Sequence, residues 1–168
     1  TLFRLFKFFF VQKAQEFKRL GFKVYFIGSR VGLPAAITQT MDHVSELTQD
    51  CQRMTVNIAI NYGGQAEILD ATKIIAQQVA DGTLSVDDID ETAFSNATHL
   101  AHCAAPDLIV RTGGDVRLSN FLLWHVAYSE LSFSDTLWPD YTPAELSAVV
   151  NDFAGKDRRF GGITKKAV

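Results

Sequence analysis

The chain has 168 residues and a formal net charge of −3 at pH 7, and 47% of its residues are hydrophobic. This length and composition exclude a disordered chain and predict a single domain, residues 1–168, with a sizeable core. The acidic balance argues against nucleic acid as a main partner. Cys51 and Cys103 give neither a disulfide framework nor a zinc motif, so we expect a reduced, cytoplasmic protein.

Predicted helices and strands alternate along the chain. Apolar residues in 2–20 predict a helix that is buried or lines an apolar cavity, because they cover more than one helical face. Four apolar stretches predict strands at 23–28, 54–60, 107–111 and 130–133. Later helices are predicted at 34–51, 65–81, 119–128 and 143–155, while 85–100 has only a weak helical pattern. The alternation predicts an α/β fold with a mainly parallel sheet flanked by helices.

A cluster of polar residues follows the third predicted strand. Arg111 ends that strand, and two glycines precede Arg117 and Ser119, which stand where the next helix is expected to begin. Two guanidiniums, a hydroxyl and a helix N-terminus would suit a diphosphate. In the competing interpretation, the arginines pair with Asp107 and Asp115 and Ser119 only caps the helix. Local chemistry leaves both interpretations open.

Two further features carry weaker signals. Glu130 opens the fourth predicted strand, where it either forms a salt bridge or binds a hard cation such as Mg²⁺ beside phosphate oxygens. Residues 61–64, Asn-Tyr-Gly-Gly, stand between a strand and a helix, where they form either a phosphate contact or a plain tight turn. They lack the glycine spacing of a dinucleotide fold and the lysine of a phosphate-binding loop.

Three segments together resemble the cis-prenyltransferases, the undecaprenyl diphosphate synthase family. The segment 106–140, PDLIVRTGGDVRLSNFLLWHVAYSELSFSDTLWPD, resembles the signature region of that family. Residues 58–64, IAINYGG, resemble an upstream block, and residues 158–162, RRFGG, resemble the C-terminal motif. The three segments occur in the family's order. The resemblance implies a parallel sheet flanked by helices, with an apolar tunnel beside a diphosphate site and helix 2–20 as a tunnel wall.

The resemblance also implies a reaction and roles for particular residues. The family condenses isopentenyl diphosphate onto an allylic diphosphate such as farnesyl diphosphate, giving a long cis-polyprenyl diphosphate such as the cell-wall lipid carrier undecaprenyl diphosphate. Arg111, Arg117 and Ser119 are expected to bind isopentenyl diphosphate, and Glu130 to help hold Mg²⁺. Arg159 and Gly161 match a motif that reaches the partner's active site in a homodimer. The lipid product leaves room for a peripheral contact with a membrane.

The chain departs from the family pattern at several points. Asp115 replaces the usual glutamate, Gln65 replaces a frequent arginine, and Ser29 replaces a common aspartate. The family's N-terminal block, with its catalytic carboxylate and the loop for the allylic diphosphate, is not among these residues. No catalytic residue of the family is therefore assigned in this chain, which resembles the C-terminal two-thirds of the enzyme. We expect the chain alone to be inactive or nearly so.

Two other classes of protein compete with the enzyme interpretation. A non-catalytic partner subunit of a heteromeric cis-prenyltransferase would keep the C-terminal motif but typically lose the isopentenyl diphosphate site. Arg111, Arg117, Ser119 and Glu130 are all present, which disfavours that alternative. A generic phosphate-binding α/β module is disfavoured by the length of the match over 106–140.

Overall fold

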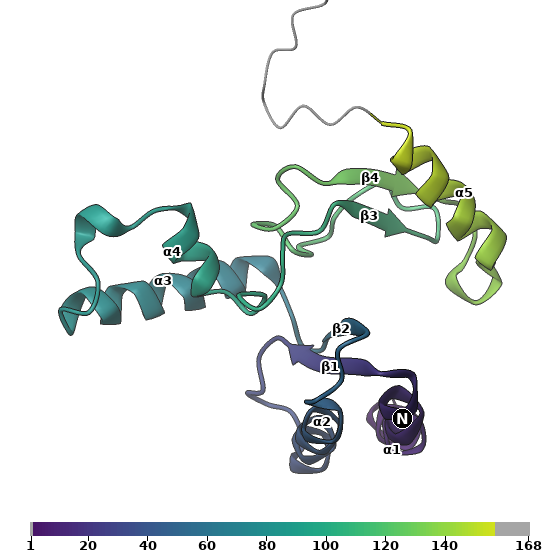
Figure 1. Cartoon of the computed structure of the whole chain (residues 1–168), viewed down its shortest axis with the longest axis horizontal. Coiled ribbons are helices and arrows are strands. Elements are labelled where there is room, and N and C mark those ends of the chain that lie inside the picture. The colour runs from purple at the N-terminus through teal and green to yellow at the C-terminus, as the bar shows by residue number, and fades with distance from the viewer. Residues whose placement is uncertain (1, 157–168) are drawn as a thin grey trace, which may run out of the picture. The chain divides into compact units, whose positions relative to one another are not determined.

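The computed structural model describes residues 2–156 and consists of two compact units, Thr1–His102 and Cys103–Val168. Each unit contains a sheet of two parallel strands with helices beside it (Figure 1). The predicted α/β class, with parallel strands flanked by helices, is therefore confirmed. That all 168 residues form one domain stays a prediction. None of the helices in the described range is long and apolar enough to cross a membrane.

The sheet of the first unit pairs β1 (Phe22–Ile27) with β2 (Met54–Ala59) in parallel, in register from the first residue of each strand to the last. The helix α2 (Ala35–Thr48) connects the two strands, because parallel neighbours need a crossover. The helix α1 (Leu2–Leu20) packs beside α2, and both contact β1 (Figure 1). Helices 2–20 and 34–51 and both strands were predicted within a few residues of these bounds.

The core of the first unit lies between α1, α2 and the sheet. Its buried residues are Phe10 and Ala14 on α1, Val24 on β1 and Val44 on α2, with partly buried Phe6, Phe17, Phe26, Leu47 and Ile58 around them. Thr48, at the end of α2, is fully buried and still satisfied. Its hydroxyl accepts a hydrogen bond from the Val24 N–H at 3.0 Å and donates one to the Val44 carbonyl at 2.8 Å. These bonds fix the end of α2 against β1.

The loops that follow β1 and β2 are joined closely. Gly28 has a φ of +111°, and a Cβ there would lie 2.2 Å from the carbonyl oxygen of Ile60, so only glycine fits. Asn61 has a φ of +51°, and its side-chain amide donates to the carbonyls of Ser29 and Val31 at 3.0 and 3.1 Å. The turn at Asn61 is therefore held to the loop that follows β1.

The first unit ends in a helical pair. The helix α3 (Gly64–Ala80) packs against the short α4 (Glu91–Asn96) through buried Ala71, Ile75 and Ala97, with Leu84 and Phe94 beside them. The carboxylate of Asp90 accepts a hydrogen bond from the Ala93 N–H at 2.7 Å and caps α4. The weak helical pattern of 85–100 thus corresponds to the single turn η1 (Val86–Asp88) and to α4.

The second unit pairs β3 (Leu108–Arg111) with β4 (Glu130–Phe133) in parallel, followed by a turn of 3₁₀ helix, η2 (Trp138–Asp140), and the helix α5 (Pro143–Ala154). A capping box between Thr142 and Glu145 begins α5, close to the predicted start of this helix. The Thr136 hydroxyl also donates to Glu145 at 2.7 Å. This bond, followed by those from Thr142, lowers the pKa of Glu145 below its ordinary value.

The helix predicted over 119–128 is wrong. This segment forms consecutive turns, and Ser119, Asn120 and Leu122 have φ values of 47°, 64° and 49°. Left-handed backbone at three non-glycine residues within four positions is incompatible with a right-handed helix. The periodic apolar residues therefore pack in a turn region, and Leu122 and Val126 are buried there.

A buried carboxylate connects α3 to its neighbours. Glu67 is only 1% exposed, and its carboxylate accepts hydrogen bonds from the Tyr62 hydroxyl at 2.5 Å and from the His99 backbone N–H at 3.0 Å. The Nδ1 atom of His99 lies 3.8 Å from the same carboxylate. The pattern of apolar residues did not point to this network, because Glu67 belongs to an otherwise ordinary amphipathic helix.

We predict that Glu67→Leu destabilises the first unit. The change removes the buried acceptor of two partly buried hydrogen bonds, and leaving a buried donor without its partner costs about 1–3 kcal/mol. Glu46→Leu, at an exposed position of α2, should change the free energy of unfolding by no more than about 0.5 kcal/mol. Urea denaturation followed by circular dichroism compares the two, and equal midpoints would contradict a stabilising role for Glu67.

Candidate functional site

The second unit has a pocket at the carboxyl end of β3. It measures about 380 Å³ and is lined by the polar residues Arg111, Thr112, Arg117 and Ser119, and by apolar Ile109, Val110, Leu118 and Phe121. The three residues predicted to bind a diphosphate, Arg111, Arg117 and Ser119, thus lie together around one cavity. Carboxyl ends of parallel strands are where ligands of α/β proteins bind.

Asp115 holds the two arginines together. Its Oδ2 atom accepts hydrogen bonds from Nη2 of Arg111 at 2.9 Å and from Nη2 of Arg117 at 2.7 Å. The other terminal nitrogen of Arg111, Nη1, donates to the Ser119 hydroxyl at 2.9 Å and to the Arg117 carbonyl. The competing interpretation therefore holds in part, since both arginines pair with Asp115. Pairing does not exclude anion binding, because the Arg117 side chain remains 64% exposed.

The backbone around this pocket contributes shape more than hydrogen bonds. Gly113 and Gly114 have φ values of +92° and +83°, so the turn after Arg111 requires glycines. Their N–H groups donate to the carbonyls of Thr136 and Ser134, both at 2.9 Å, and are already used within the unit. No helix begins at Ser119, so the predicted helix N-terminus is not part of the site. An anion here would be bound by side chains, the two guanidiniums and the Ser119 hydroxyl.

Glu130 lies away from this pocket. In the register of the two strands Glu130 is opposite Leu108, whereas Arg111 is opposite Phe133, so the ladder separates the two residues by about 10 Å. The Glu130 carboxylate instead pairs with the Lys156 ammonium at 3.1 Å. Within residues 2–156 no three His, Cys, Asp or Glu side chains form a group that could hold a metal ion. The predicted role of Glu130 as a metal ligand stays a prediction.

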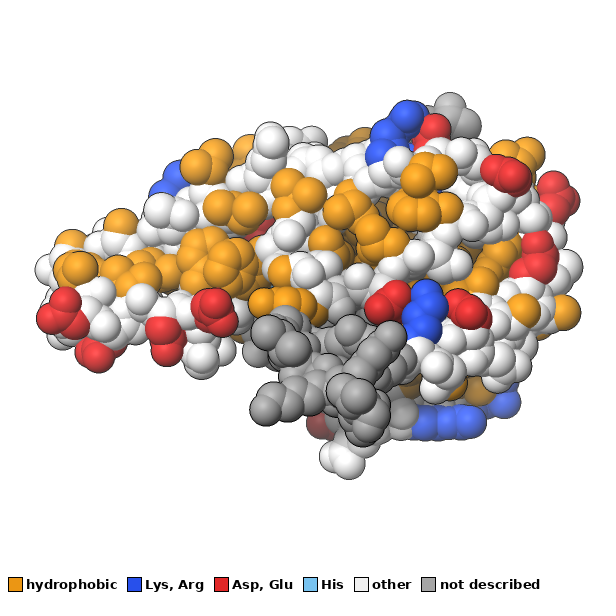
Figure 2. Space-filling model, turned by 90° about the horizontal axis from the view of Figure 1, so that it is seen from above, with side chains coloured by type: hydrophobic (Ala, Val, Ile, Leu, Met, Phe, Trp, Pro, Cys, Tyr) orange, Lys and Arg blue, Asp and Glu red, His pale blue; other side chains and the backbone are white. Residues whose placement is uncertain are grey.

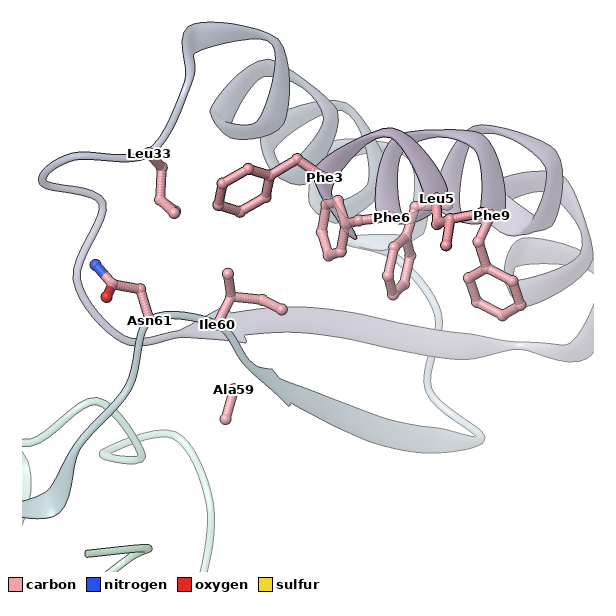
Figure 3. A pocket seen from close by; sticks show the side chains of 9 residues that line it. Phe3, Leu5, Phe6, Phe9, Leu33, Ala59, Ile60 and Asn61 are labelled. Atoms are coloured by element: carbon pink, nitrogen blue, oxygen red, sulfur yellow. The ribbon is translucent and has the colours of Figure 1, made fainter. Parts of the chain in front are cut away.

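The first unit has an apolar pocket of about 580 Å³. Figure 3 shows Phe3, Phe6 and Phe9 of α1 along one side of the pocket, with Ile60 and Asn61, which follow β2, on the opposite side. Leu5, Phe10, Leu33 and Ala59 complete the lining. Phe10 belongs to both the pocket and the core, whereas Phe8 faces solvent and is 65% exposed. The helix therefore provides a cavity wall and core packing, as its multi-sided apolar pattern predicted.

The remaining predicted residues have simpler surroundings. Ser29 accepts a hydrogen bond from the Val31 N–H at 3.2 Å through its hydroxyl and helps shape the loop after β1. Gln65 is exposed in the first turn of α3. Arg159 and Gly161 lie outside the described residues, so their predicted role at a partner's site stays a prediction. Sequence reasoning weighed Asp115 as the partner of one arginine and missed that it bridges both.

Comparisons with known proteins agree with one another. The family model described as putative undecaprenyl diphosphate synthase matches residues 1–161. The chain is 44% identical over 165 residues to the chloroplastic (2Z,6Z)-farnesyl diphosphate synthase of Solanum lycopersicum, covering 97% of this chain and 56% of that protein. It is 47% identical over 135 residues to a ditrans,polycis-undecaprenyl-diphosphate synthase ((2E,6E)-farnesyl-diphosphate specific) of Lactiplantibacillus plantarum, covering 79% and 52%. The chain thus spans about half the length of the curated relatives it matches.

Solved structures of prenyl diphosphate synthases also resemble this chain. Lavandulyl diphosphate synthase from Lavandula x intermedia, in complex with dimethylallyl diphosphate, matches with a TM-score of 0.90 and 30% identity, over 95% of this chain and 70% of that one. A probable undecaprenyl diphosphate synthase from Campylobacter jejuni matches with a TM-score of 0.83 and 31% identity, over 95% and 72%. None of these comparisons bears out the expectation that the chain alone is inactive, which stays a prediction.

We predict that Glu130→Gln lowers the pKa of Lys156. The hydrogen bond to Glu130 is the main cause that raises the pKa of Lys156 above its ordinary value. The ion pair with Glu130 stabilises the fold only while Lys156 is protonated. This stabilisation is therefore complete at a pH below the ordinary lysine pKa and is lost as the pH rises through the raised pKa of Lys156. Titration of the Lys156 side chain by NMR measures the shift. Asp152→Asn, which removes the carboxylate 3.4 Å from Lys156, is the control and should have the smaller effect. A larger effect of Asp152→Asn would contradict the assignment.

Proposed function

Because this chain belongs to the undecaprenyl diphosphate synthase family, we propose that it is part of a cis-prenyltransferase. The proposed enzyme condenses isopentenyl diphosphate onto an allylic diphosphate, farnesyl diphosphate, and repeats the step to give a long polyprenyl diphosphate. The observation that carries the proposal is the pocket that gathers Arg111, Arg117 and Ser119 in the second unit. The apolar pocket lined by Phe3, Phe6 and Phe9 in the first unit also supports the proposal, since a prenyl tail needs apolar surroundings.

The proposed reaction breaks the bond between the allylic carbon and its diphosphate oxygen. The diphosphate leaves with the bonding electron pair, the double bond of isopentenyl diphosphate bonds to the allylic carbon, and the resulting cation loses a proton. Arg111, Arg117 and Ser119 would hold the diphosphate of isopentenyl diphosphate and so fix its double bond for attack. The Nη2 atoms that donate to Asp115 would turn to phosphate oxygens when the diphosphate binds. The base that accepts the proton is not assigned.

We further propose that the full-length protein uses Mg²⁺, and the support is the family to which the chain belongs. The described residues do not by themselves fit this ion, because Glu130 is paired with Lys156 and lies away from the arginine pocket. Removal of divalent cations with EDTA should abolish turnover and added Mg²⁺ should restore it; turnover that persists in EDTA would exclude the requirement.

A cytoplasmic location and a homodimer complete the proposal. Cys51 and Cys103 form no disulfide in the described part of the chain, which is compatible with a reducing compartment. Cell fractionation tests the location, and recovery outside the cytoplasmic fraction would contradict it. The dimer rests on the resemblance of Arg159 and Gly161 to a motif that acts at the partner's site.

The substrate assignment predicts a selective effect of Arg117→Ala. In a full-length protein that carries these residues, labelled isopentenyl diphosphate and farnesyl diphosphate should give a butanol-extractable product. Arg117→Ala should weaken the use of isopentenyl diphosphate by roughly 10- to 150-fold, the worth of a hydrogen bond to a charged group. The KM for farnesyl diphosphate should change much less.

Arg30→Ala is the matched control for this experiment. Arg30 is also a half-exposed arginine in an ion pair, with Asp42, but it belongs to the first unit. It should leave both KM values unchanged. If Arg117→Ala affected both substrates equally, the isopentenyl diphosphate assignment would be wrong. No product from the folded wild-type protein would refute the proposed function itself.

The homodimer predicts that two inactive variants rescue each other. Arg117→Ala and Arg159→Ala are prepared separately as full-length proteins and then mixed under conditions in which subunits exchange. If Arg159 acts at the partner's site, a mixed dimer has one site with both defects and one intact site, so activity returns. If exchange is demonstrated and activity does not recover, the motif does not act across the dimer.

A further inference from the structure

The helix α1 has a second face that neither the core nor the apolar pocket uses. Core residues Phe10, Ala14 and Phe17 are spaced i, i+4 and i+7 and lie on one side of the helix. Arg4, Phe8 and Val11 repeat the same spacing on the other side. Phe8 and Val11 are 65% and 53% exposed. A large apolar side chain on this face gains nothing from the fold that the structure describes.

The charges on this face have one sign. Arg4 and Lys7 flank Phe8 and Val11, and with Gln12 they line a surface hollow of about 330 Å³. Neither cation forms an ion pair with any described residue. The only acidic residue of α1, Glu16, is paired with Lys13 at 2.6 Å. Lys18 and Arg19 add positive charge in the last turn, although the chain as a whole has a net charge of −3.

From this juxtaposition we propose that the outer face of α1, formed by Arg4, Lys7, Phe8 and Val11, docks on an anionic lipid bilayer. Apolar side chains beside unpaired cations, on a helix nearly free of acids, are the pattern of helices that lie in the membrane interface. Phe8 and Val11 would enter the boundary of the acyl chains, and the guanidinium and ammonium would contact lipid phosphates. The contact is parallel to the surface and does not cross the bilayer. It does not depend on the proposed reaction.

Exposed apolar side chains alone would not support this proposal. Figure 2 shows hydrophobic side chains on a face of the molecule where acidic side chains lie among them. Leu146 and Val150 on α5 are also 46% and 47% exposed, and Glu145 and Asp152 lie on that helix. The outer face of α1 differs because its charge is complementary to anionic lipid. An acidic bilayer, which offers apolar depth and phosphate together, suits it better than an acidic protein surface.

The test is co-sedimentation of the chain with vesicles, without substrate. One set of vesicles is an equal mixture of phosphatidylglycerol and phosphatidylcholine, and the other is phosphatidylcholine alone. The protein should bind the anionic vesicles, and high salt should weaken the binding. Arg4→Gln with Lys7→Gln should lower the partition coefficient roughly 30-fold, and Phe8→Ser roughly 10-fold. All three positions are on the surface, and circular dichroism checks that the variants remain folded.

Matched controls lie on α3 and η1. Lys73→Gln removes an exposed cation, and Val86→Ser removes an exposed apolar side chain with the same 65% exposure as Phe8. Both should bind like the wild type. The proposal is overturned if the wild type ignores anionic vesicles, or if the control variants lose as much binding as the α1 variants. It is also overturned if sedimentation without lipid shows self-association that Phe8→Ser abolishes, because a second copy would then cover this face.

Discussion

Parallel strand pairing is the constraint on which both pockets depend. Parallel strands end at the same edge of a sheet, so the loops that follow β1 and β2 lie next to each other. The side-chain amide of Asn61, after β2, donates hydrogen bonds to carbonyls in the loop after β1. The apolar pocket is lined from this edge by Ile60 and Asn61 and from α1 by its phenylalanines. In the second unit, the same rule places Arg111 at the carboxyl end of β3, where the chain turns through two glycines.

Local patterns predicted most of the secondary structure because they act over a few residues. The apolar strands, and the start of α5 with its capping box at Thr142, are set by neighbours in sequence. The gathering of Arg111, Arg117 and Ser119 was also predictable, since they lie within nine positions of one another at a strand end. The apolar wall formed by α1 followed from a helix whose phenylalanines occupy more than one face.

Other features depend on contacts that no local pattern contains. The apolar residues of 119–128 are spaced as in a helix, yet left-handed backbone at Ser119, Asn120 and Leu122 forms turns that bury Leu122 instead. The burial of Glu67 requires a hydroxyl at Tyr62 and a backbone N–H at His99, 32 residues away. The distance of Glu130 from the arginines follows from strand register, which a list of strands does not specify.

The bridge formed by Asp115 has a consequence for which anions the arginine pocket accepts. A carboxylate tethered beside two guanidiniums is an internal ligand at high effective concentration. A monovalent anion from solution would offer the guanidiniums little more than the Asp115 carboxylate already does, and so would compete with it poorly. A diphosphate carries several oxygens and more charge, and can engage both guanidiniums and the Ser119 hydroxyl at once. In the proposed site, Asp115 would therefore disfavour monovalent anions and would be displaced more readily by a polyanion.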